Sequence, residues 1–156
     1  MGYTLEAVIA GETLLRTAAA PEPAAVVVPL GGGLALIPMT DELFDAVTDG
    51  TEPETGFHRL PGGFGRVLAQ WSAAGPVAYV EAEFFGGWGE QHAVVWASGT
   101  PALGPLHQPE GEPSPPEGSP ISQALRRLGV VVADGDVDEF ETAGLGRHRF
   151  TKRWAG

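Results

Sequence analysis

Hydrophobic residues occupy every second position from Tyr3 to Ile9, with polar residues at two of the positions between them. This alternation predicts a half-buried β-strand, because neighbouring side chains of a strand point to opposite faces. Two continuous hydrophobic runs follow, at 24–30 and 34–39, and three glycines join them. Short runs separated by glycines are typical of a hairpin, and hydrophobic residues on both faces indicate central strands.

The clearest strand pattern lies at 77–96, VAYVEAEFFGGWGEQHAVVW. Two alternating stretches flank the glycine-rich segment 86–89, which predicts a second hairpin with a tight connection. A last short extended segment is expected at 102–106, and the hydrophobic residues 130–132 are compatible with one more strand.

Four segments have hydrophobic residues at helical spacing, and two of them follow a helix start signal. Thr40 and Ser119 are suitable N-cap residues, and Pro120 suits the first helical position after Ser119. The expected helical segments are 12–19, 41–49, 63–73, 120–128 and a final turn within 138–145.

These elements predict a single α+β domain spanning residues 1–156. We expect an antiparallel sheet of five or six strands, with three or four helices packed mainly on one face. The hydrophobic content of 43% is sufficient for one core at this length. Residues 107–119, HQPEGEPSPPEGS, contain no large hydrophobic side chain and predict a flexible surface loop.

Composition removes several classes of function. The chain has no cysteine, which excludes disulfides, thiolate zinc sites and cysteine nucleophiles. The formal charge of −11 disfavours nucleic-acid binding and favours a partner protein with a basic surface. Neither a signal peptide nor a membrane-spanning stretch is visible, so we expect a cytoplasmic protein that does not insert into membranes.

The hairpin at 77–96 carries the residues that we expect to bind a partner protein. A tryptophan at a loop tip is a frequent binding hot spot, and alternating glutamates could form an acidic patch beside it. Alternating glutamates on an antiparallel strand are, however, usually just its solvent face. The expected partner-binding residues are Trp88, Glu81, Glu83, Glu90 and Phe85.

The same hairpin also allows an alternative, in which a small ligand is bound or hydrolysed near the loop 86–90. Closely spaced glycines expose backbone amides that could hold an anion, although the segment is not a complete nucleotide-binding motif. Imidazole and guanidinium groups from elsewhere could converge there. The residues of this alternative site are Gly86, Gly87, Gly89, His92, Arg147 and His148.

A metal site is not expected from the sequence, and neither is a cofactor or a catalytic residue. The four histidines form no HExxH or similar motif, and a zinc site would need three ligands from different elements. The one constellation to consider is His92 with Glu90 and Glu83. Arg147 and its basic neighbours are expected to pair with acidic residues of the same chain.

Three segments together resemble a group of small, uncharacterised bacterial proteins of actinobacterial type: VAYVEAEFFGGWGEQHAVVW, PISQALRRLGVV and DEFETAGLGRHRFTKRW. Members carry the patterns AYxEAxYFGGxGxQxAxVW, PINxALRxLG and GLxxHR, from which this chain departs at Phe84 and Ser122. In size, acidity and α+β composition the chain is also similar to immunity proteins of bacterial polymorphic toxin systems. That similarity implies non-catalytic binding of a partner protein.

Overall fold

The computed structural model describes residues 2–86 and 88–156, with Trp88 described in its backbone only. Within these residues, six strands form one sheet in which every neighbouring pair is antiparallel. The strands are β1 (Tyr3–Gly11), β2 (Val28–Gly31), β3 (Leu34–Pro38), β4 (Val77–Phe85), β5 (Trp88–Ala97) and β6 (Thr100–Gln108). Their order across the sheet is β2-β3-β1-β4-β5-β6, so the α+β class and the strand number are confirmed.

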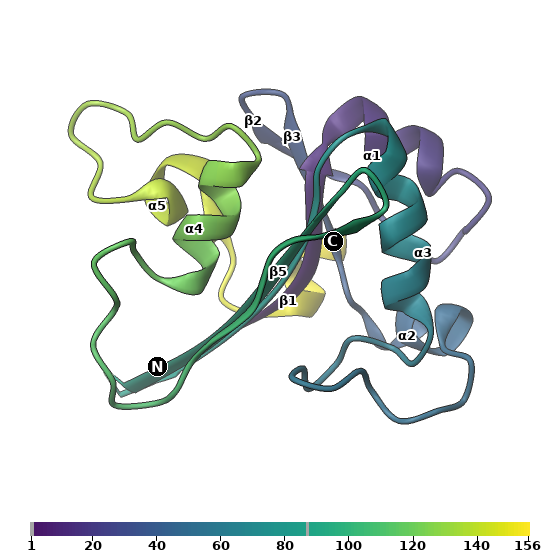
Figure 1. Cartoon of the computed structure of the whole chain (residues 1–156), viewed down its shortest axis with the longest axis horizontal. Helices are drawn as coiled ribbons and strands as arrows, with labels where there is room; N and C mark the ends of the chain where they lie inside the picture. Colours follow the sequence, from purple (N-terminus) through teal and green to yellow (C-terminus); the bar gives the residue numbers. More distant parts are fainter. Residues whose placement is uncertain (1, 87) are drawn as a thin grey trace.

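The helices cover both faces of the sheet (Figure 1). They are α1 (Glu12–Ala18), α2 (Asp41–Val47), α3 (Phe64–Trp71), α4 (Pro120–Arg127) and α5 (Glu139–Ala143), together with three short 3-10 helices, η1 (Ser72–Ala74), η2 (Leu145–Arg147) and η3 (Thr151–Ala155). Figure 1 shows α4 and α5 on one side and α1, α2 and α3 on the other. The described residues thus contain five α-helices rather than three or four, and one-sided packing was a wrong expectation.

Alternation along the central strands explains this two-sided cover. Leu5 and Ile9 of β1 point into the core beneath α4, whereas Val8, between them, points into the core beneath α3. We call these two sides of the sheet the α4 face and the α3 face. All five residues of β3 are buried, so both faces needed covering.

The N-caps predicted from the sequence are confirmed. The Thr40 hydroxyl accepts a hydrogen bond from the Leu43 amide at 3.1 Å, and the Ser119 hydroxyl accepts one from the Ser122 amide at 3.2 Å. Residues 130–132 are not a strand, because they pair with none of the six strands, and Val131 is 83% exposed. The last strand is longer than expected and includes His107, which was assigned to the flexible loop.

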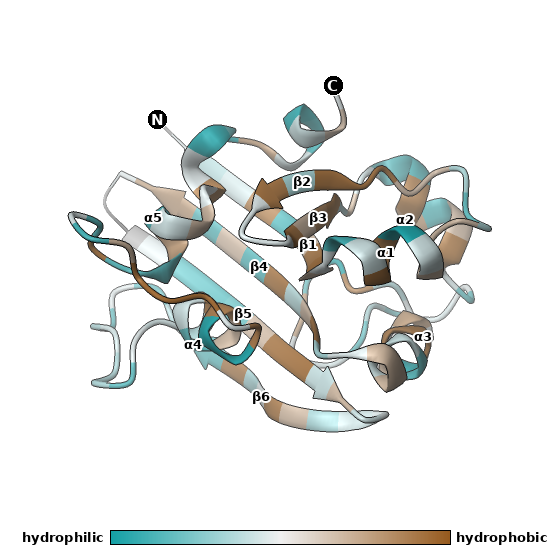
Figure 2. Cartoon of the chain, turned by 90° about the horizontal axis from the view of Figure 1, so that it is seen from above, coloured by the Kyte–Doolittle hydropathy of each residue, from teal (hydrophilic) through white to brown (hydrophobic). Residues whose placement is uncertain are grey.

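The β4–β5 hairpin positions the candidate site. Glu81 is paired with His92 across the two strands, and Glu83 is paired with Glu90. Figure 2 shows hydrophobic residues along the part of β5 that is far from the hairpin tip, and hydrophilic residues toward the tip. Gly86 adopts a left-handed conformation at the turn, with φ +59. Polar groups are therefore concentrated where the hydrophobic core ends.

The C-terminal segment lies alongside the first half of β1. Phe150 forms a parallel bridge with Thr4, and the Thr151 hydroxyl donates to the Glu6 carboxylate at 2.8 Å. The Arg147 guanidinium donates to the carbonyl oxygens of Pro29 and Leu30 in β2. Among the described residues, no helix combines the length and hydrophobicity needed to cross a bilayer.

Candidate metal site

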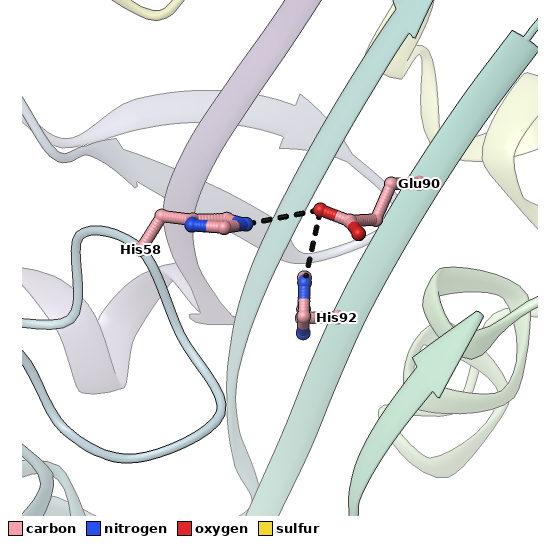
Figure 3. Close-up of side chains that lie close together, drawn as sticks. All are labelled: His58, Glu90 and His92. Atoms are coloured by element: carbon pink, nitrogen blue, oxygen red, sulfur yellow. Dashed lines mark hydrogen bonds and ion pairs between the residues drawn. The ribbon is translucent and has the colours of Figure 1, made fainter. Parts of the chain in front are cut away.

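Three histidines surround the Glu90 carboxylate on the α3 face, close to the hairpin tip. His58 Nε2 lies 2.9 Å from Glu90 Oε1, and His92 Nε2 lies 3.3 Å from the same oxygen. His107 Nε2 lies 3.1 Å from the other oxygen, Oε2. Figure 3 shows the rings of His58 and His92 directed toward the carboxylate, one from a loop and one from β5.

The sheet itself brings three of these four residues together. Glu90 and His92 are two positions apart on β5, so their side chains lie on the same face. His107 of β6 is directly paired with His92. Their rings are stacked, with centroids 4.2 Å apart and an interplanar angle of 6°. Strand pairing therefore fixes the backbone positions of these three residues relative to one another.

The fourth residue, His58, comes from the loop 48–63 between α2 and α3. The buried carboxylate of Glu81 holds this loop against β4. Its Oε1 accepts the His58 amide at 2.7 Å, and its Oε2 accepts the Arg59 amide at 2.7 Å and the Tyr79 hydroxyl at 2.8 Å. Burial, and secondly the Glu81 carboxylate, raises the pKa of Tyr79 well above its ordinary value, so the phenol remains a donor.

His92 has an unusual environment for a histidine. It is only 7% exposed, and neither of its ring nitrogens has a hydrogen-bond partner among the described residues. Its 3.3 Å contact with Glu90 does not have hydrogen-bond geometry. A neutral imidazole has one nitrogen with a free lone pair, and leaving a buried polar group unsatisfied costs about 1–3 kcal/mol. The ring is thus available as a ligand.

Hydrogen bonds from neighbouring histidines keep Glu90 ionised, the form in which a carboxylate binds a metal ion. The hydrogen bond from His58, and less strongly the one from His107, lowers the pKa of Glu90 to about 2 against the opposing effect of burial. The same bond to Glu90 raises the pKa of His58, and partial burial opposes this shift. Glu90 is therefore ionised throughout the physiological range, while His58 gains a proton more readily than an isolated histidine.

The cluster fits a metal ion held by two imidazoles and one carboxylate. One ligand atom from each of His58, Glu90 and His92 can be chosen so that all lie within 4.8 Å of one another. Neighbouring ligands of a tetrahedral zinc ion are separated by about 3.3 Å, given bonds of about 2.0 Å. The contacts of 2.9 and 3.3 Å with Glu90 are close to that separation. The His58 side chain is 67% exposed, so its ring is free to adjust.

The structure confirms one pair of the constellation considered from sequence and replaces its third member. Glu90 and His92 lie together, whereas Glu83 is exposed and is not part of the group. His58 takes its place. Nothing in the sequence pointed to His58, because it is 32 residues from Glu90 and its position depends on how the loop docks.

The residues expected to bind a partner protein are distributed differently from the sequence hypothesis. Glu81 is only 3% exposed because the loop 48–63 covers it, so it does not contribute to an exposed acidic patch. Glu83 and Phe85 are exposed, Phe85 by 74%. Gly87 and the side chain of Trp88 lie outside the described residues.

The basic residues of the alternative site do not converge on the hairpin. Arg147 binds carbonyl groups of β2, and its guanidinium lies 5.4 Å from the ring of Trp154. The ring of His148 packs against the same tryptophan, with centroids 4.8 Å apart. The described ion pairs do not include Arg147, which contradicts the expected pairing with an acidic residue. Of the three glycines, Gly86 forms the turn, and Gly89 is opposite Phe84.

Comparisons with known proteins add no assignment. The chain matches no protein-family model, and no curated protein or solved structure is significantly similar to it. The geometry of the cluster around Glu90 is consequently the basis for the functional proposal below.

Proposed function

We propose that this protein binds a divalent transition-metal ion, with Zn²⁺ as the best fit, through His58 Nε2, His92 Nε2 and Glu90 Oε1. The observation that carries the proposal is the buried imidazole of His92, which has no hydrogen-bond partner among the described residues and lies beside a carboxylate whose pKa is lowered. A metal ion would use the free lone pair of this ring and would compensate the charge of Glu90.

The donor atoms select the class of metal. Two imidazole nitrogens and one carboxylate oxygen suit zinc and its neighbours in the first transition row. Calcium and magnesium prefer sites built from oxygen ligands, so they should compete weakly.

The second carboxylate oxygen has its own partner. His107 donates to Glu90 Oε2 and so favours a one-oxygen coordination through Oε1. Such outer hydrogen bonds orient the ligands of metal sites and contribute to affinity. Three protein ligands leave at least one coordination position for water or another ligand, as in zinc sites that bind exogenous groups.

The proposal is tested by titrating the metal-free protein with Zn²⁺ at pH 7.5 and following heat or a competing chromophoric chelator. We expect one strong site, lost in His92→Phe and in Glu90→Gln. His148→Phe is the matched control, because His148 packs on Trp154 rather than in the cluster. A wild type that does not bind, or a His92→Phe variant with unchanged affinity, would contradict the proposal.

A second candidate function is binding of a partner protein with a basic surface at the hairpin tip, in the manner of an immunity protein. The exposed ring of Phe85 near the exposed carboxylate of Glu83 favours it. Immobilised wild type should capture a stoichiometric partner from a lysate of the native organism, and Phe85→Ala should lose it. Phe150→Ala, at another exposed phenylalanine, is the control. Capture that is unchanged by Phe85→Ala would argue against a site at the tip.

A further inference from the structure

His58 differs from the other two proposed ligands in how it is held. Glu90 and His92 are fixed by β5, whereas His58 belongs to the loop 48–63 and its ring is largely exposed. The ring contacts the cluster through Glu90 Oε1 and edge-on through His92, with ring centroids 5.2 Å apart, and it reaches both only where the loop backbone brings it. The backbone at this point is bound by Glu81.

Glu81 and the loop satisfy each other. The buried carboxylate receives three hydrogen bonds, two of them from consecutive loop amides and one from Tyr79. A buried carboxylate without such donors would be strongly unfavourable. Two further loop residues extend the contact, since Leu60 is buried and the Phe57 ring packs edge-on against Tyr79 with centroids 5.4 Å apart. Docking of the loop therefore supplies hydrogen bonds that allow the Glu81 carboxylate to be buried.

We infer that Glu81 is a positioning residue of the metal site, which places His58 on Glu90 through the loop backbone without touching the metal itself. This inference rests on the proposed metal-binding function. It implies that metal affinity and docking of the loop are one coupled equilibrium, so that each strengthens the other.

The direct test is Glu81→Gln, measured by Zn²⁺ titration. A glutamine would present an NH₂ group to one of the two loop amides, and at least one of the hydrogen bonds would be lost. We expect the affinity for Zn²⁺ to fall about 10–100-fold, as for other residues that orient metal ligands. Glu83→Gln is a closely matched control, because it removes the same charge two residues further along β4 from an exposed position.

A double-mutant cycle separates positioning from general damage. If Glu81 acts through His58, adding Glu81→Gln to a His58→Ala variant should change the affinity less than about twofold. A second full loss in that background would show that Glu81 acts through the sheet or through charge, and would overturn the inference.

Amide exchange in the wild type provides a test that needs no variant to fold. Zn²⁺ at saturation should slow hydrogen exchange of the His58 and Arg59 amides at least tenfold, because both amides are bound to Glu81 in the docked loop. Unchanged exchange in a protein that binds Zn²⁺ would refute the coupling. Failure of the wild type to bind Zn²⁺ would instead refute the proposed function, so the two failures are distinguishable.

Discussion

Replacing His92 by phenylalanine should make the metal-free protein more stable while removing its response to Zn²⁺. Both ring nitrogens of His92 are buried without a hydrogen-bond partner among the described residues. An unsatisfied buried polar group costs about 1–3 kcal/mol, and phenylalanine removes that cost in a ring of similar shape. The larger ring and the lost 3.3 Å contact with Glu90 offset part of the gain. We expect a net stabilisation of about 1 kcal/mol, which raises Tm by about 2–4 °C at this chain length.

Adding Zn²⁺ should reverse this difference, so that the wild type becomes more stable than the His92→Phe variant. At a free concentration of 100 Kd, an ion that binds only the folded state adds about 2.7 kcal/mol, or about 5–11 °C in Tm, to the wild type. The variant should gain nothing. Thermal unfolding by circular dichroism, with chelator and then with Zn²⁺, measures both effects, and His148→Phe controls for the loss of a histidine elsewhere. The reasoning would be refuted by a variant that is less stable without metal and still gains stability with it.

Three further results are expected. The affinity for Zn²⁺ should fall as the pH is lowered, beginning above pH 6.5, because the raised pKa of His58 lets protons compete with Zn²⁺ for its ring nitrogen. An affinity that does not change between pH 8 and pH 5 would count against His58 as a ligand. His107→Phe should preserve the stacking but lose the donor to the carboxylate, and should weaken Zn²⁺ binding about tenfold in the same titration; equal affinity would remove His107 from the site. Gly89→Ala should destabilise the fold by about 1–3 kcal/mol in urea unfolding, because the new methyl group would collide with the Phe84 ring. The control Gly146→Ala, which has open space around it, should leave the stability unchanged. An equally neutral Gly89→Ala would show that the Phe84 ring moves freely.

The sequence was sufficient to predict the hairpin and the pairing of its polar residues on one face. Alternation on either side of the glycine-rich segment places Glu90 and His92 two residues apart on a strand, and this spacing alone puts them together. The burial of Glu81 could not be predicted in this way. The same alternation is typical of a solvent-exposed face, and only the docking of a loop more than 20 residues away decides otherwise.

His107 shows how an uncertain strand boundary can hide a site residue. The segment that follows it, 109–118, is rich in proline, glutamate and glycine, which favour a loop, and local preference ends the strand before His107. Pairing with β5 extends β6 to Gln108 and stacks His107 on His92. The two-sided helix cover did have a signal, because the run at 34–39 is hydrophobic at nearly every position and so requires burial on both faces.

The most direct measurement is a crystal structure of the protein saturated with Zn²⁺, with anomalous data collected at the zinc absorption edge. The proposal predicts one strong anomalous peak on the α3 face, about 2.0–2.2 Å from His58 Nε2, His92 Nε2 and Glu90 Oε1. A strong peak at another position, or no peak at the cluster under saturating Zn²⁺, would contradict the proposal.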